Sequence, residues 1–136
     1  KTNKTDNKEE DNRYISFYKI IFEIIVADHE IKDDEIQIAS KLLEDFFGIE
    51  KSISILEFEK LRDNGYFNID LTKITIELKK LLPYVERQKL IQICWQTLLI
   101  DKDEDVLETS TVRKISTLLG IEDQDFISIR NRVKKS

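Results

Sequence analysis

The 136-residue chain is 40% apolar and 36% charged, a composition typical of one globular domain and not of a disordered chain. Three glycines and one proline are too few for the many turns of a β-sandwich or barrel, so helices joined by short connections are favoured. The formal net charge of −5 argues against a nucleic-acid-binding protein, because such proteins neutralise phosphates with a basic surface.

The N-terminal part of the chain begins with a polar segment and then becomes helical. Residues 1–12 are almost wholly polar, and we expect a disordered leader or a tag remnant ahead of a helical domain over residues 13–136. In Tyr14–Ala27 apolar residues recur at helical spacing on several faces, which predicts a central helix. The next predicted helix starts with Asp33 as its N-cap and stops at Gly48.

Two further helices are expected in the middle of the chain. The first covers about Lys51–Asp63, and its apolar residues include Ile53, Leu56 and Leu61. Asp70 is expected to cap the second, which Pro83 ends because proline cannot continue a helix.

The C-terminal part predicts three more helices. Tyr84–Leu99 is dense in apolar residues and is expected to be the second central helix. The following helix begins near Asp105 and ends at Gly120. The last helix is expected to turn its basic residues outward: Arg130, Arg132, Lys134 and Lys135. The predicted fold is therefore all-α, a bundle of about seven helices.

An internal repeat divides this bundle into two related halves. Asp28 is followed seven residues later by Glu35, and Asp101 is followed seven residues later by Glu108. Each pair comes after an apolar helix and opens an amphipathic helix. That helix ends in two apolar residues, which are followed by Gly and then Ile. Repetition of a helix, an acidic turn and a second helix predicts a pseudo-twofold arrangement.

These paired motifs resemble those of the TerB-like family, named after a tellurite resistance protein and shared with the N-terminal region of the DjlA co-chaperone. The resemblance covers about Tyr14–Val133 and is particularly close to a short stand-alone bacterial branch. It implies a TerB-like helical fold and a role in a stress-response or envelope-associated system. His29 and Lys102 stand where the family usually has glycine, which weakens the transfer of a family metal site to this chain.

The two acidic turns are the candidate metal site. Clustered carboxylates suit a divalent cation such as Ca²⁺, Mg²⁺ or Mn²⁺, and they equally suit helix N-termini, where they cap free N–H groups. An EF-hand is not expected, because Val106 and Val112 occupy the positions that need Gly and Glu. The candidate ligands are Asp28, Glu35, Asp101, Asp103, Asp105 and Glu108.

No catalytic residues are predicted, and we expect a protein that is not an enzyme. Cys94 lies among apolar neighbours, which indicates a buried thiol, and the chain lacks a nucleophile elbow or a phosphate-binding loop. A single cysteine excludes an internal disulfide, fits a reducing compartment and favours a cytoplasmic location. No apolar run is long enough for a transmembrane segment, while peripheral membrane association stays open.

Two functions are compatible with these features. The first is an interaction module that binds an unidentified protein partner through an acidic face. The alternative is a divalent-cation-binding domain that uses the two acidic turns. The residues expected at an interaction surface are His29, Glu30, Tyr66 and Phe67.

Overall fold

The computed structural model describes residues 15–24, 31–64, 70–99 and 106–135, the last range without the side chains of residues 106–109. Within these ranges the chain forms seven helices and no strand, which confirms the predicted all-α class. None of the described helices is long and apolar enough to cross a membrane. The helices are residues 15–24, α2 (Asp33–Phe47), α3 (Lys51–Asp63), α4 (Leu71–Leu81), α5 (Tyr84–Leu98), α6 (Val106–Leu118) and α7 (Asp123–Lys135).

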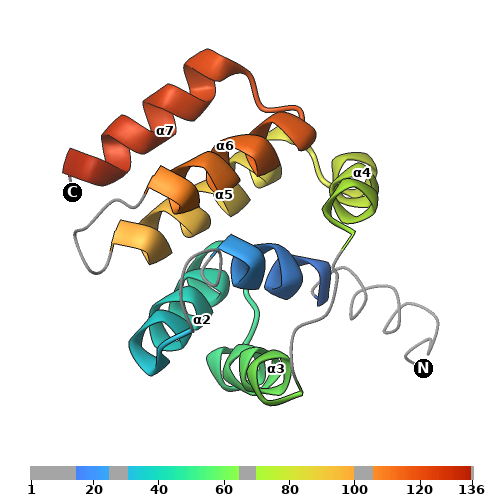
Figure 1. Ribbon diagram of the computed structural model, residues 1–136, viewed down its shortest axis with the longest axis vertical. Helices are drawn as coiled ribbons and strands as arrows, with labels where there is room; N and C mark the ends of the chain where they lie inside the picture. The colour runs from blue at the N-terminus through green and yellow to red at the C-terminus, as the bar shows by residue number, and fades with distance from the viewer. Residues whose placement is uncertain (1–14, 25–30, 65–69, 100–105, 136) are drawn as a thin grey trace.

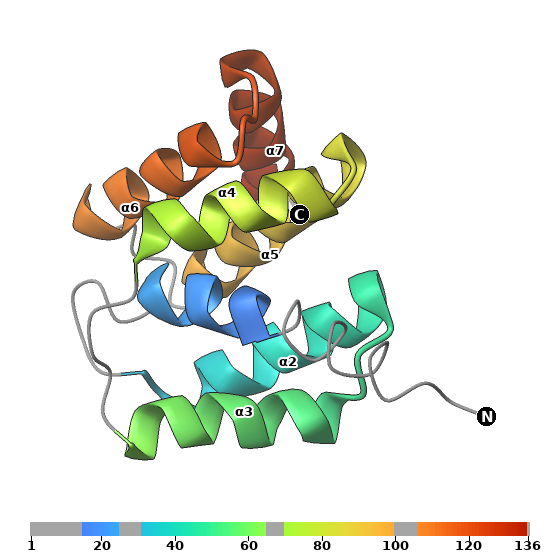
Figure 2. The same cartoon turned by 90° about the vertical axis from the view of Figure 1, so that its right-hand side faces the viewer.

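The first helix lies at the centre of the bundle. In Figures 1 and 2 residues 15–24, drawn in blue, lie between the pair formed by α2 and α3 and the layer formed by α4 to α7. α2 packs on α3 and α5, and α5 also packs on α7 and α6. The two halves of the repeat therefore meet across the first helix, α2 and α5.

Burial follows the predicted apolar pattern in both central helices. Most of the first helix is buried: Phe17, Tyr18, Ile20, Ile21, Phe22 and Ile24. The C-terminal two-thirds of α5 is buried in the same way: Leu90, Ile91, Ile93, Cys94, Trp95 and Leu98. Helices that are apolar on several sides need neighbours on several sides, and this requirement places them at the centre.

Two glycines end equivalent helices in the two halves. Gly48 follows α2 with φ of 71°, and Gly120 follows α6 with φ of 75°, both in the left-handed region that favours glycine. The isoleucine after each glycine, Ile49 or Ile121, is buried. Two predicted helix ends are thus confirmed, and they match each other as the internal repeat requires.

α3 buries one of its apolar faces and exposes the other. Phe58 and Ser54 are buried, while Ile53 and Leu56 are 50% and 57% exposed. The ring of Phe58 packs edge-on against Tyr18, with ring centroids 5.3 Å apart, and the Tyr18 hydroxyl lies 3.2 Å from that of Ser54. α3 carries apolar residues on two faces, and the face with the large aromatic ring is the one that is buried.

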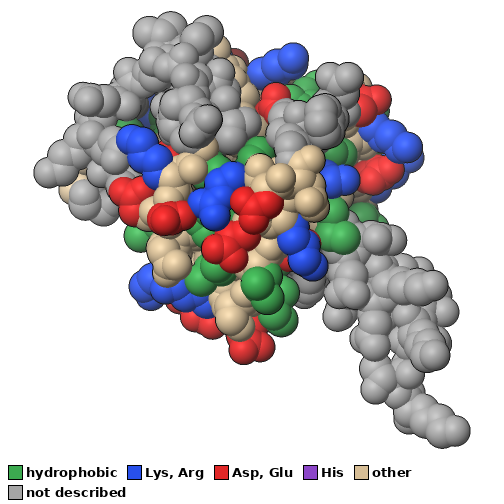
Figure 3. Space-filling model, turned by 60° about the horizontal axis from the view of Figure 1, so that its bottom comes forward, with side chains coloured by type: hydrophobic (Ala, Val, Ile, Leu, Met, Phe, Trp, Pro, Cys, Tyr) green, Lys and Arg blue, Asp and Glu red, His purple; other side chains and the backbone are tan. Residues whose placement is uncertain are grey.

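The outer surface on the α3 side has mixed chemistry. Figure 3 brings forward the face on which α3 lies in Figure 1, and hydrophobic side chains there are interspersed with Lys, Arg, Asp and Glu. Lys60 and Glu57 form an exposed ion pair within α3, and Arg62 lies close to both Glu59 and Asp63. Opposite charges are therefore balanced along this helix.

Candidate functional site

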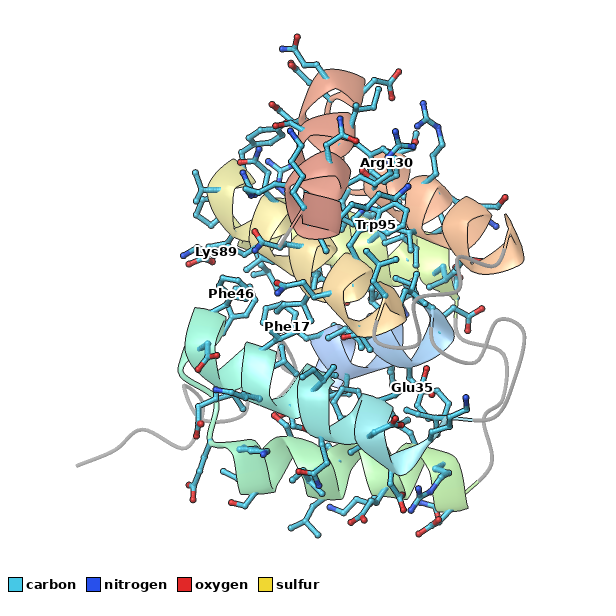
Figure 4. The ribbon with its side chains drawn as sticks, turned by 90° about the vertical axis from the view of Figure 1, so that its left-hand side faces the viewer. Phe17, Glu35, Phe46, Lys89, Trp95 and Arg130 are labelled. Atoms are coloured by element: carbon cyan, nitrogen blue, oxygen red, sulfur yellow. The ribbon has the colours of Figure 1, made fainter. Side chains whose placement is uncertain are left out.

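The helix ends that border both acidic turns lie at one end of the bundle, which we call the acidic end. It comprises the end of the first helix at residue 24, the start of α2, the end of α5 and the start of α6. Figure 2 shows all four on the left, and the opposite view in Figure 4 places them on the right, near the labelled Glu35. The fold therefore brings the borders of the two repeats together, although the acidic pairs are 73 residues apart in the sequence.

The start of α2 shows how one acidic residue is used locally. Lys32, and not Asp33, occupies the N-cap position, so the predicted cap was wrong by one residue. Glu35 is 2% exposed, and its Oε1 accepts a hydrogen bond of 2.9 Å from the backbone N–H of Lys32. Because Glu35 reaches back to satisfy this N–H, the helix begins one residue before the expected position. The contact supports the capping interpretation of Glu35.

The two aspartates beside Glu35 remain at the surface. Oδ1 of Asp33 accepts a hydrogen bond of 2.7 Å from Arg62 of α3, and this contact raises the pKa of the Arg62 guanidinium. Oδ1 of Asp34 accepts a hydrogen bond from the backbone N–H of Glu35. Since the Asp33 side chain is 88% exposed, its ion pair contributes little to folding and leaves the carboxylate accessible to solvent.

A buried carboxyl oxygen on the first helix was missed by the sequence analysis. Oε2 of Glu23 is buried and has no hydrogen-bond partner in the structure described. Burial raises the pKa of this carboxyl, and the positive charge of Lys114 on α6 partly opposes the rise. The sequence offered one signal, since Glu23 is a charged residue within an otherwise apolar run.

The single thiol has no catalytic environment. Cys94 is fully buried, which confirms the sequence interpretation, and burial raises the pKa of its thiol far above the usual range. A thiol of this kind is a poor nucleophile, because the reactive form is the thiolate.

An open depression along α7 offers no enclosed binding site. Arg132, on its wall, donates a hydrogen bond of 3.1 Å to the side chain of Gln92 on α5. Ligand pockets usually enclose a small molecule between several elements, whereas this depression follows one helix and is wide open. Its lining residues are Gln124, Ile127, Ser128, Asn131, Arg132 and Lys135.

Comparison with known proteins identifies the family. The family model described as tellurite resistance protein TerB matches residues 15–131 of the chain. The chain belongs to the TerB family. A search of curated proteins and a search of solved structures found no match.

Most of the candidate site residues of this TerB-family domain lie outside the described part of the chain. Only Glu35 among the candidate metal ligands has a described side chain. Within the described ranges no group of three or more His, Cys, Asp or Glu is placed to hold a metal ion. The candidates that lie outside are Asp28, His29, Glu30, Tyr66, Phe67, Asp101, Asp103 and Asp105, together with the side chain of Glu108.

Proposed function

We propose that this TerB-family domain is a non-enzymatic interaction module, and that its acidic end binds a basic surface of a protein partner. One observation carries the proposal: the borders of both acidic turns lie at the same end of the bundle. A surface built from both halves carries more negative charge than either turn alone. Such a surface favours partners of opposite charge and accelerates their association.

The described side chains at this end support a binding surface. Asp33 and Asp34 are exposed, so their carboxylates are available to a partner. The ion pair between Asp33 and Arg62 joins the start of α2 to α3 and orients the Asp33 carboxylate without burying its charge. A partner therefore meets carboxylates that are already held in place, which reduces the entropy lost on binding.

Support for a non-enzymatic role comes from the thiol and from the depression along α7. Cys94 is buried and unreactive, and the depression does not enclose a small molecule. We further propose a role in a stress-response system, as the family's description suggests. Direct contact with tellurium oxyanions is not part of the proposal, because a chain with net charge −5 repels anions.

Neutralising the aspartates at the start of α2 tests this proposal. We expect D33N/D34N to weaken capture of a specific partner from cell extract by about three- to tenfold, as the loss of two partly exposed charge pairs implies. E44Q/D45N is the matched control, since it removes two charges from the opposite end of the same helix. The measurement is quantitative mass spectrometry of proteins bound to each immobilised variant.

The control decides whether binding is local or merely reflects net charge. A partner that is lost with D33N/D34N and kept with E44Q/D45N fits the proposal, provided that added salt also weakens its capture. If D33N/D34N captures every partner as well as E44Q/D45N does, the proposal is contradicted.

A second candidate function is binding of a divalent cation at the same end. The specific observation in its favour is the buried Oε2 of Glu23, which is unpartnered within the described ranges. A buried carboxyl oxygen without a donor is costly, and a cation would offset this cost. For Glu35 itself, the hydrogen bond from the backbone N–H of Lys32 favours a role as a helix cap over a role as a metal ligand.

Thermal unfolding of the metal-free protein tests the cation proposal. At a concentration of about 100 Kd a bound cation stabilises the fold by roughly 2.7 kcal/mol, which predicts a rise in Tm of about 5 °C or more. We expect this rise with one of Ca²⁺, Mg²⁺ or Mn²⁺ at millimolar concentration, and its loss in D28N/D101N. An unchanged Tm with all three cations would remove this candidate at useful affinities.

A further inference from the structure

Exposed apolar side chains flank the turn between α4 and α5. Leu81 is 59% exposed and Val85 is 60% exposed, the two highest values among the large apolar residues described. Leu82, between them, is buried and anchors the turn, while Pro83 is exposed. We call Leu81, Pro83 and Val85 the apolar corner.

The apolar corner lies in a cationic stretch of an acidic chain. Between Lys73 and Lys89 there are five Lys and Arg residues and two Glu residues, whereas the whole chain has a net charge of −5. Lys79 and Lys80, in the last turn of α4, are exposed directly before Leu81. Exposed lysines can pair with the headgroups of an anionic lipid surface, and the exposed apolar side chains beside them can enter its apolar layer.

The negative groups near this corner do not cancel its charge. Glu77 and Glu86 are the two carboxylates in the stretch. Asp125 of α7 accepts a hydrogen bond from the hydroxyl of Tyr84, which also accepts one from the backbone N–H of Glu122. Arg87 is directed inward, where its Nη1 donates to the backbone oxygen of Leu119. The cationic surface therefore depends on the lysines.

The exposed apolar residues of α3 lack this combination. Ile53 and Leu56 on α3 are exposed to a similar degree, but α3 carries three cationic and three anionic residues, and several of them pair with one another. The apolar corner is also a turn between two helices, on which Leu81 and Val85 are exposed. A fluid lipid surface fits a projecting turn of this kind.

We propose that the apolar corner docks this domain on an anionic lipid bilayer. Leu81 and Val85 enter the boundary between headgroups and acyl chains, and the lysines contact the headgroups. In Figure 2 the α4–α5 turn lies at the right of the upper layer, whereas the acidic end lies on the left. Docking through the corner thus leaves the acidic end directed away from the lipid and free to bind a partner.

Co-sedimentation with vesicles tests this assignment. The purified full chain is mixed with vesicles of phosphatidylcholine alone or with 30% phosphatidylglycerol, at low salt and at about 150 mM salt. We expect binding to the anionic vesicles only. L81E/V85E should reduce the partition coefficient by about tenfold or more, and K79Q/K80Q should reduce it by about twenty-fivefold, since each lysine contributes roughly fivefold.

A matched variant separates the corner from general surface effects. I53E/L56E adds the same two charges at similarly exposed apolar positions on α3, and we expect most of the binding to be kept. Circular dichroism checks that each variant is folded. Absence of wild-type binding to anionic vesicles would overturn the assignment and leave a protein as the occupant of the corner. Equal loss in I53E/L56E and L81E/V85E would overturn it too.

Discussion

Trp95→Ala is expected to destabilise the fold by about 3–5 kcal/mol, as the loss of a large buried aromatic side chain usually does. Trp95 is fully buried on α5, and its ring packs against Phe126 of α7, with centroids 5.7 Å apart. Figure 4 shows it between α5, α6 and α7. Removing the indole opens a cavity at the junction of these helices. Urea unfolding followed by far-UV circular dichroism measures the loss.

A second substitution separates ring packing from hydrogen bonding. Nε1 of Trp95 is buried and has no acceptor among the described residues, so Trp95→Phe removes an unpaired donor and keeps one aromatic ring. We expect Trp95→Phe to cost less than half as much as Trp95→Ala. If the free energy of unfolding of Trp95→Ala stays within about 1 kcal/mol of the wild-type value, the ring does not support the core as described.

Arg87→Met is expected to lower the free energy of unfolding by about 2–3 kcal/mol, because Arg87 connects the turn between α4 and α5 to the turn between α6 and α7. Its Nη1 donates a hydrogen bond of 2.6 Å to the backbone oxygen of Leu119, and its Nε donates to that of Leu82. The guanidinium also lies over the ring of Tyr84, 5.3 Å from the centroid. Methionine keeps the apolar stem but loses all donors, so the same urea titration reports their contribution.

Lys80→Met is the matched control for this substitution. Lys80 is an exposed cation close to the same turn, and its replacement should change stability by no more than about 0.5 kcal/mol. Equal effects of Arg87→Met and Lys80→Met would show that the backbone contacts of Arg87 contribute nothing beyond charge.

The repeat and the helix ends could be predicted from the sequence because they depend on local chemistry. Gly48 and Gly120 have the left-handed backbone that the expected helix ends require. Asp70 caps α4 as predicted, its Oδ1 accepting a hydrogen bond of 3.1 Å from the backbone N–H of Lys73. Central positions for the first helix and α5 follow from apolar residues on several faces. Each of these signals lies within one helix.

Features that depend on distant contacts could not be predicted in this way. The buried face of α3 is chosen by Phe58 and its contact with Tyr18 on another helix. Glu23 meets the charge of Lys114 only because the fold brings the first helix close to α6. The two acidic turns can be paired in the sequence by their likeness, but the shared position of the helix ends that border them depends on how the two halves pack. Most candidate residues in those turns lie outside the described part of the chain.

The two ends of the bundle differ in chemistry, and the proposals assign them different roles. The start of α2, at one end, exposes Asp33 and Asp34. The α4–α5 turn, at the other, exposes Leu81 and Val85 beside lysines. Because different substitutions test the two surfaces, failure of either proposal leaves the other intact.

The most direct test of the central claim measures the dissociation constant of the captured partner for variants in each half. D33N/D34N and D101N/D103N neutralise one half each, and a fourfold variant neutralises both. A composite acidic end predicts that each pair weakens binding by about three- to tenfold and that their combination weakens it further. If either pair leaves the dissociation constant within about twofold of the wild type, the two halves do not form one binding surface.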